Sequence, residues 1–86
     1  MIEIEQKSRF YHALGDQTRL KIIEYLLKSK CKCICHLADY VKKDQSTVVR
    51  HIEILKNAGI VETKKEDKFL WCCIKDKEKL KKLLEA

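Results

Sequence analysis

The chain has 86 residues, a formal net charge of +6 and a pI of about 9.1, which exclude a large multidomain protein and favour a polyanionic partner. The positive charge is spread along the sequence, so it is also typical of a lysine-rich solvated surface. No apolar run reaches the ~18–20 residues that a membrane span needs, and the acidic start of the chain is unlike the basic start of a signal peptide. We therefore expect one cytoplasmic domain over residues 1–86, with no membrane contact.

Two helices are predicted at the start of the chain. Residues 3–14 form the first, with Phe10, Tyr11 and Leu14 at its apolar positions, and Gly15 breaks it. Asp16 is placed to cap the second helix, because its carboxylate can accept hydrogen bonds from backbone N–H groups of the first turn. The apolar positions of this second helix are Leu20, Ile23, Leu26 and Leu27. The polar residues 29–32 are predicted to form a loop.

A short third helix and a longer fourth helix are predicted next, on either side of a tight turn at residues 42–44. The apolar positions of the third helix are Ile34, Leu37, Ala38 and Val41. Two helices joined in this way form a helix-turn-helix unit, here over about residues 33–58. The second helix of such a unit can enter the major groove of DNA.

The fourth helix has two distinct faces. Its apolar stripe, at i, i+4 and i+7, consists of Val48, Ile52 and Leu55. Its opposite face carries Ser46, Arg50, Glu53 and Asn57. Ser46 or Gln45 is predicted to start the helix, with Ser46 the better cap, and Gly59 is predicted to stop it in a left-handed conformation. A first turn with short polar side chains and one arginine can reach base edges.

The rest of the chain is predicted to form a β-hairpin and a last helix. Residues 60–63 and 69–74 have the composition of strands, and the charged residues 64–68 lie between them. A hairpin with basic residues at its tip is a wing, here over about residues 60–74. The last helix, at about residues 76–85, has Leu80, Leu83 and Leu84 on one side and is too short to be stable alone. The predicted fold class is mainly α with a small β-hairpin, a winged helix-turn-helix.

The five cysteines point to metal binding or redox chemistry. Their number is odd, and three are crowded into Cys31-Lys32-Cys33-Ile34-Cys35, which suits a disulfide framework poorly. Residues at i and i+2 point ~200° apart on an α-helix, so Cys33 and Cys35 cannot hold one ion from a straight helix. The site needs an unwound first turn, or Cys31 in the preceding loop. The alternative to a metal site is that the three cysteines are small apolar residues near a loop, or an adventitious redox cluster.

Two further cysteines are adjacent on the second strand of the wing, so they face opposite sides. Cys72 is predicted to face the core as a small buried side chain, and Cys73 to face outward, where it could approach another cysteine. The sequence leaves open whether either takes part in a site. His51, beside the apolar stripe of the fourth helix, is predicted to have a structural role.

Two segments carry a resemblance to a known family. They are ALGDQTRLKII at residues 13–23 and QSTVVRHIEILKNAGIV at residues 45–61. With their spacing, they closely resemble the ArsR family of winged-helix repressors. The resemblance implies a homodimeric DNA-binding repressor, with the first and last helices at the dimer interface. Many members of the family release their operator when a metal or metalloid binds.

A third match is Cys33-Ile34-Cys35-His36-Leu37, which resembles the Cys-Val-Cys-Asp-Leu segment that binds arsenic, antimony, cadmium or lead in this family. The third cysteine of the arsenic-type pattern is replaced by Ala38, and Cys31 is an additional thiol that can substitute for it. The last helix has no histidine for the zinc site that some members build there. We expect no obligatory cofactor, and an inducer site for arsenic, antimony, cadmium, lead or zinc at Cys31, Cys33 and Cys35.

The expected partners are a double-stranded DNA operator, a second copy of the chain and the inducer. The residues predicted to face base edges or flanking phosphates are Gln45, Ser46, Thr47, Val49 and Arg50. Those predicted to meet phosphate or the minor groove are Lys42, Lys43, Lys64, Lys65 and Lys68. No nucleophile–base pair, phosphate loop or carboxylate pair stands out, so we predict that the chain is not an enzyme. Two alternatives remain: a metal-independent or thiol-redox-responsive DNA-binding regulator, and a winged-helix protein-interaction module.

Overall fold

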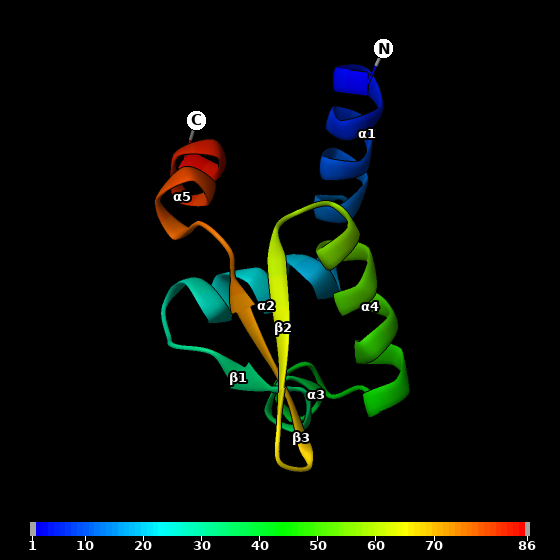
Figure 1. Cartoon of the computed structure of the whole chain (residues 1–86), viewed down its shortest axis with the longest axis vertical. Helices are drawn as coiled ribbons and strands as arrows, with labels where there is room; N and C mark the ends of the chain where they lie inside the picture. The colour runs from blue at the N-terminus through cyan, green and yellow to red at the C-terminus, as the bar shows by residue number, and fades with distance from the viewer. Residues whose placement is uncertain (1, 86) are drawn as a thin grey trace.

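The computed structural model describes residues 2–85 and confirms the predicted fold class, with a mostly helical chain and a small antiparallel sheet (Figure 1). The elements in chain order are α1 (Ile2–Leu14), α2 (Gln17–Leu27), β1 (Lys32–Cys33), α3 (Ile34–Val41), α4 (Gln45–Asn57), β2 (Val61–Glu66), β3 (Phe69–Ile74) and α5 (Lys77–Glu85). Within residues 2–85, no helix is both long enough and apolar enough to cross a membrane.

A single core lies between α2, α3, α4 and the inner face of the sheet. The largest fully buried side chains are Ile22, Ile23, Leu26, Leu37, Val48, Ile52, Leu55, Val61 and Cys72. The predicted apolar stripe of α4 is therefore confirmed. The buried side chains come from every element that surrounds α4, so the position of α4 is fixed by the core.

The apolar stripe of α2 differs from the prediction at its first position. Leu20 is 36% exposed, whereas Ile22 and Ile23 are fully buried. The buried face begins one residue earlier, at Arg19, whose guanidinium enters the protein with only 7% of the residue exposed. A charged residue at a buried position does not register as part of an apolar pattern, which is why the stripe was misplaced.

Several helix ends are as predicted, and α4 begins at Gln45, one of the two predicted starts, but its capping residue was wrong. The carboxylate of Asp16 caps α2 by accepting from the backbone N–H of Arg19 at 3.0 Å, and Gly59 has a φ of +77° after α4. The N-cap of α4 is Asp44, not Ser46 or Gln45, because the carboxylate of Asp44 accepts from the backbone N–H of Thr47 at 3.3 Å. Both Gln45 and Ser46 are inside the helix.

The sheet has three strands in the order β1-β3-β2, one more than predicted. The additional strand, β1, occupies part of the segment that was expected to be a loop, and it pairs with β3 through Lys32 and Cys72 and through Cys33 and Trp71. The wing is a hairpin of β2 and β3 as predicted, but β2 extends to Glu66, three residues beyond the predicted strand, because residues 64–66 pair with β3. The turn is therefore shorter than the predicted tip, and Asp67 has a φ of 56° in it.

The elements divide between two ends of the molecule (Figure 1). α1 and α5 lie toward the upper end in this view, where both chain termini are found. α3, the N-terminal end of α4 and the tip of the wing lie at the lower end. The segments predicted to contact DNA are thus brought to one end, opposite the terminal helices.

Candidate functional site

α4 exposes the face that the sequence predicted. Ser46, Arg50, Glu53 and Asn57 are all exposed, while the opposite stripe is buried. Of the other side chains predicted to face DNA, Gln45 is exposed, and Thr47 and Val49 are partly buried. The first two turns of α4 are therefore available to a groove, with Gln45 and Arg50 as their longest polar side chains.

The first turn of α4 is organised by Asp44. The Thr47 hydroxyl donates to this carboxylate at 2.6 Å, and the Ser46 hydroxyl donates to its other oxygen. These two hydroxyl donors, the larger contribution coming from Ser46, lower the pKa of Asp44 to about 2. Two of the predicted DNA-facing hydroxyls are therefore engaged within the protein, and Asp44 stays ionised at neutral pH beside them.

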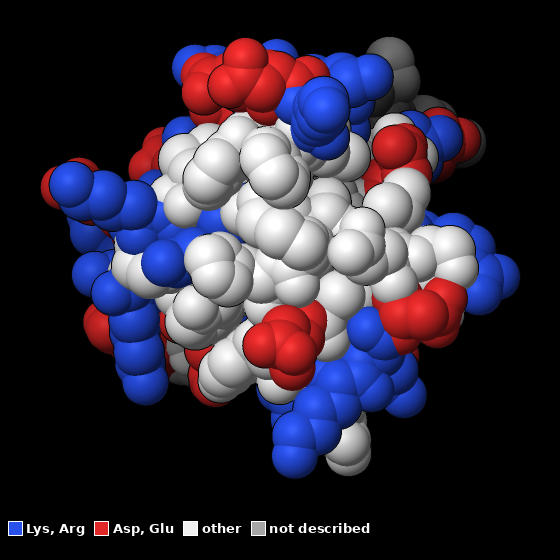
Figure 2. All heavy atoms as spheres, turned by 90° about the horizontal axis from the view of Figure 1, so that it is seen from below, with Lys and Arg blue, Asp and Glu red and all other residues white. Residues whose placement is uncertain are grey.

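The predicted phosphate-contacting lysines occupy the turn before α4 and the wing. Lys42 has a left-handed φ of 59° at the end of α3, and both Lys42 and Lys43 are exposed. Lys64, Lys65 and Lys68 on the wing are also exposed. Figure 2 looks at the lower end of the molecule and shows Lys and Arg side chains around a central uncharged surface, with acidic side chains between them. A polyanion approaching this end meets cations from both the turn and the wing.

A buried arginine that sequence reasoning missed ties the helices behind this surface together. Arg19 Nε donates to the carbonyl of Ala13 at 2.7 Å, and Arg19 Nη2 donates to that of His12 at 3.2 Å, which satisfies the C-terminal end of α1. Arg19 Nη1 lies 3.0 Å from His51 Nδ1 on α4, so the predicted structural role of His51 is confirmed. One feature of the sequence could have indicated the burial of Arg19. The capping residue Asp16 lies three residues before it, so an arginine stands in the first turn of α2, next to the end of α1.

The cysteines at the start of α3 are only partly arranged as predicted. Cys33 is the N-cap of α3 in an extended conformation, outside the helix, and this places it against Cys35, to which it is disulfide-bonded with a Cα–Cα distance of 5.3 Å. Cys31 is bonded instead to Cys73 on β3. The expectation that the cysteines suit disulfides poorly was therefore wrong, because the strand pairing brings a distant cysteine beside Cys31. No group of three His, Cys, Asp or Glu side chains in residues 2–85 is arranged to hold a metal ion. The set Cys31, Cys33 and Cys35 stays a prediction for the reduced protein.

Cys72 is fully buried, as predicted, and is the free thiol of the chain. Burial raises the pKa of the Cys72 thiol to about 12 because the core cannot solvate a thiolate. Cys72 is therefore an inert packing residue, and its neighbour Cys73 has a different environment on the opposite face of the strand.

Similar sequences and a family model agree with this arrangement. The model for "Bacterial regulatory protein, arsR family" matches residues 16–63, which run from the cap of α2 to the start of the wing. An uncharacterised HTH-type transcriptional regulator from Methanocaldococcus jannaschii is 41% identical over 66 residues, covering 77% of this chain and 74% of that protein.

Two relatives have names that refer to metal or metalloid resistance. A cadmium resistance transcriptional regulatory protein CadC homolog from Staphylococcus aureus is 33% identical and covers 91% of this chain. The arsenical resistance operon repressor of Bacillus subtilis is 36% identical and covers 78% of this chain. The chain spans only 64% and 59% of the lengths of these two proteins.

Solved structures share the fold. The homodimeric winged helix-turn-helix DNA-binding domain of a possible ArsR-family regulator from Mycobacterium bovis has a TM-score of 0.85 at 23% identity, covering 98% of this chain and 79% of that one. A crystal structure of a possible transcriptional regulatory protein from the same organism has a TM-score of 0.83 at 25% identity, covering 95% and 89%. The helix-turn-helix, the wing and the family match together show that the chain is a DNA-binding transcriptional regulator of the ArsR family and not an enzyme.

Proposed function

We propose that the protein acts as a homodimeric repressor whose α4 reads the major groove of an operator half-site. The observation that carries the proposal is the shared position of the exposed first turn of α4 and the wing at one end of the molecule (Figure 1). Gln45 and Arg50 are the side chains that reach base edges, and Lys42, Lys43, Lys64, Lys65 and Lys68 contact the backbone. Ser46, Thr47 and Val49 line the contact around them.

The test compares a reading residue with a positioning residue. Arg50→Ala should weaken specific binding by roughly 1–3 kcal/mol and relax preference at one base pair, because a bidentate contact to guanine is lost. Lys64→Ala should instead weaken binding to all sequences about equally and reduce the salt dependence. The measurement is a gel shift against DNA upstream of the protein's own gene, at several salt concentrations. Equal loss of specificity in both variants would contradict the division of roles.

The same experiment separates this function from a protein-interaction module. If the protein is a repressor, the wild type should still bind its upstream DNA at moderate salt, because contacts to base edges add to the phosphate contacts. If the wild type binds all tested promoters at low salt and none at moderate salt, the result would support the protein-interaction module instead.

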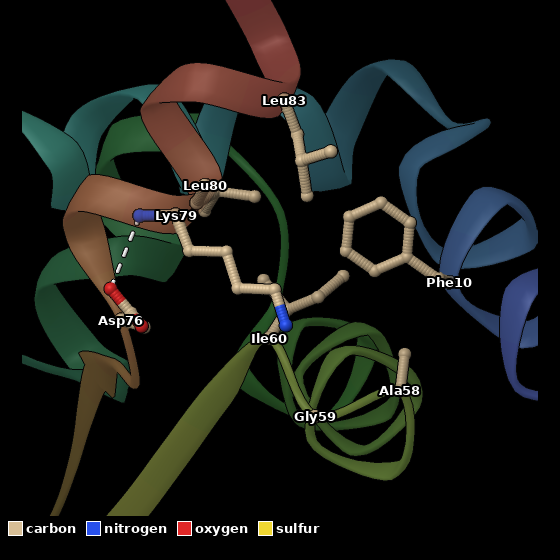
Figure 3. A pocket seen from close by; sticks show the side chains of 8 residues that line it. All are labelled: Phe10, Ala58, Gly59, Ile60, Asp76, Lys79, Leu80 and Leu83. Carbon is tan, nitrogen blue, oxygen red and sulfur yellow. Dashed lines mark hydrogen bonds between the residues drawn. The ribbon is translucent and has the colours of Figure 1, made fainter.

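A second copy of the chain is proposed to cover the exposed apolar side chains of α1 and α5. Ile4 and Tyr11 on α1 are 67% and 64% exposed, and Leu83 and Leu84 on α5 are 45% and 38% exposed. Figure 3 shows Phe10 of α1 and Leu83 of α5 pointing toward one another across a hollow floored by Ile60. Exposed apolar surface of this kind on so small a domain favours association. The homodimeric neighbour from Mycobacterium bovis has the same fold.

The proposed inducer is a thiophilic metal or metalloid bound in the reduced protein by Cys33, Cys35 and Cys31. The extended conformation of Cys33 supports this assignment, since it lets Cys33 and Cys35 direct their sulfurs to one point at the start of α3. Soft thiolates favour arsenic, antimony, cadmium, lead and zinc. Relatives named for cadmium and arsenical resistance agree with this class. Because α3 packs on α4, an ion that distorts the start of α3 would disturb the reading helix.

A further inference from the structure

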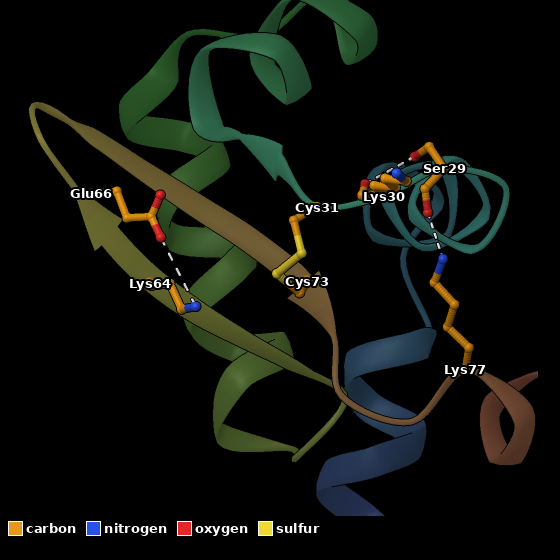
Figure 4. Close-up of a disulfide and its surroundings, with 7 residues drawn as sticks. All are labelled: Ser29, Lys30, Cys31, Lys64, Glu66, Cys73 and Lys77. Carbon is orange, nitrogen blue, oxygen red and sulfur yellow. Dashed lines mark hydrogen bonds and ion pairs between the residues drawn. A yellow bond between two sulfur atoms is a disulfide. The ribbon is translucent and has the colours of Figure 1, made fainter.

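The Cys31–Cys73 pair lies on the outer face of the sheet (Figure 4). Cys31 is exposed and Cys73 is partly buried, whereas Cys72 is fully buried in the core. Adjacent residues of a strand face opposite sides, which explains why Cys72 and Cys73 differ so sharply. Both sulfurs of the pair can therefore be approached by solutes.

The backbone register brings these two cysteines together. β1 pairs Lys32 with Cys72 and Cys33 with Trp71, so the next position in the same antiparallel register sets Cys31 opposite Cys73. Their Cα atoms are 4.4 Å apart, which matches the ~4.5 Å of a non-hydrogen-bonded antiparallel pair. Strand pairing thus holds the two side chains in reach of one another before any bond between their sulfurs forms.

A surface hollow of about 330 Å³ lies beside the pair. It is lined by Cys31, Cys73, Lys30, Lys64, Glu66 and Trp71. The carboxylate of Glu66 is 3.9 Å from the ammonium of Lys64, and with Lys30 the charged residues of the lining carry an excess of positive charge. The hollow therefore suits a small anionic molecule.

The second cysteine pair has a different environment. Cys33 is only 5% exposed, and its sulfur accepts from the backbone N–H of His36 at 3.4 Å as part of the cap of α3. A solute reaches Cys31 at an exposed residue, whereas Cys33 lies behind this cap and Cys35 is partly buried. The two pairs are therefore expected to react at different rates, with Cys31 first.

We propose that Cys31 and Cys73 form a thiol–disulfide exchange site for small anionic disulfides, and that its oxidised state holds the wing in its DNA-contacting position. The Cys31 sulfur attacks one sulfur of the small disulfide and expels a first thiol. The Cys73 sulfur then attacks the Cys31 sulfur of the mixed disulfide and expels the second. Two cysteine thiols are oxidised to one protein disulfide, one small disulfide is reduced to two thiols, and these thiols take up the two protons that the cysteines lose.

The position of the bond links this chemistry to DNA binding. The cysteines are 42 residues apart, and the loop they close contains the turn before α4, α4 itself and the tip of the wing, which carry the proposed DNA contacts. β1 continues directly into α3, so the bond ties the second strand of the wing to the helix-turn-helix. A surface whose parts are already fixed loses less conformational freedom on binding. The oxidised protein should therefore bind DNA more tightly than the reduced protein, by about fivefold or more.

The test uses the full chain with Cys33→Ser and Cys35→Ser, so that Cys72 is the remaining thiol outside the pair. Serine is a good helix cap and preserves the start of α3. The reduced protein is titrated with oxidised glutathione, the reaction is stopped by alkylation, and peptide masses identify the protected residues. Cys31 and Cys73 should become protected together without retaining glutathione, and the affinity for upstream DNA should rise in parallel.

The matched control adds Cys73→Ser. This protein should retain one glutathione on Cys31, and its DNA affinity should not rise, since no cross-link forms. Continued alkylation of Cys31 and Cys73 in the parent protein would overturn the exchange site. A cross-linked parent whose DNA affinity equals that of the reduced protein would overturn the effect on the wing. Both readouts are taken without any metal, so they do not depend on the proposed inducer.

Discussion

Arg19 Nη1 lies 3.0 Å from His51 Nδ1 and so connects α2 directly to the reading helix α4. The guanidinium of Arg19 has donors only, so Arg19 is the donor of this contact. The remaining Arg19 donors hold two carbonyls at the end of α1, so one side chain joins three helices behind the DNA-facing surface. Changes at this position should therefore affect folding and DNA binding together.

We predict that Arg19→Lys lowers the free energy of unfolding by about 2–3 kcal/mol, because hydrogen bonds from a buried charge are lost and an ammonium cannot match the guanidinium fork. The measurement is urea denaturation at neutral pH. Arg9→Lys is the matched control, since Arg9 is exposed on α1 and should change little. Equal stability of the two variants would show that the Arg19 contacts contribute nothing beyond a positive charge.

The capping carboxylate of Asp16 should make stability depend on pH in the acid range. The backbone N–H of Arg19, followed by the charge of Arg19, lowers the pKa of Asp16 below 3.8, although partial burial opposes this. A group whose pKa is lower in the folded protein stabilises above its unfolded pKa of 3.8, and this contribution is lost as the pH falls through the folded pKa. Asp16→Asn keeps a capping oxygen and should flatten this part of the pH profile. An unchanged slope in the variant would assign the acid sensitivity to other carboxylates.

Leu83→Glu should convert a dimer to a monomer by placing a charge in the proposed interface. Sedimentation equilibrium at micromolar concentration should give twice the chain mass of 10.2 kDa for the wild type and a single chain mass for the variant. Lys82→Glu, at an exposed lysine of the same helix, is the control and should remain dimeric. A wild type of single chain mass at this concentration would refute the dimer itself.

The double variant Cys33→Ser, Cys35→Ser should still bind DNA but should not be released by trivalent arsenic, cadmium or zinc. Thiols must lose protons to bind these ions, so inducer affinity of the wild type should fall with acid. The coupling between inducer and DNA should be ~1–3 kcal/mol and reciprocal. The measurement is a titration of the reduced protein with each ion, with and without DNA, followed by the thiolate charge-transfer absorbance. Normal release of the double variant would place the sensor elsewhere.

Breaking the Cys31–Cys73 bond should lower the free energy of unfolding by about 2–4 kcal/mol, because a loop of 42 residues is no longer closed in the unfolded chain. Under oxidising conditions, Cys31→Ser and Cys73→Ser should have equal effects, and the double variant should lose no more than either. With a reductant present, the free energy of unfolding of all three variants should approach that of the reduced wild type. Additive losses in the double variant would mean that each cysteine contributes by packing alone.

The helices could be predicted from the sequence because their information is local. The stripe of Val48, Ile52 and Leu55, the cap at Asp16 and the left-handed Gly59 each depend on neighbours within one or two turns. The N-cap of α4 was predicted one or two residues too late, because aspartate, serine and threonine can all cap a helix and three such residues stand close together. The geometry of the turn at Lys42 selects Asp44.

The features that sequence reasoning missed depend on distant residues. β1 is two residues long and has no pattern of its own; it exists because β3 offers a free edge. Arg19 is buried because carbonyls of α1 and the ring of His51 converge on it from other helices. The partner of Cys31 is likewise set by strand register, and no spacing within the crowded cysteines indicates Cys73.

The pairing of β1 with β3 also has a consequence for the order of folding. The two strands lie on either side of the whole helix-turn-helix and the first strand of the wing, so their contact closes a long loop and must overcome its entropy. Contacts within α2–α4 are more local and should form first, since low contact order favours speed. A chain emerging from the ribosome would therefore assemble its reading helix before the three-stranded sheet. In pulsed hydrogen exchange, amides of α4 should gain protection before those of β1.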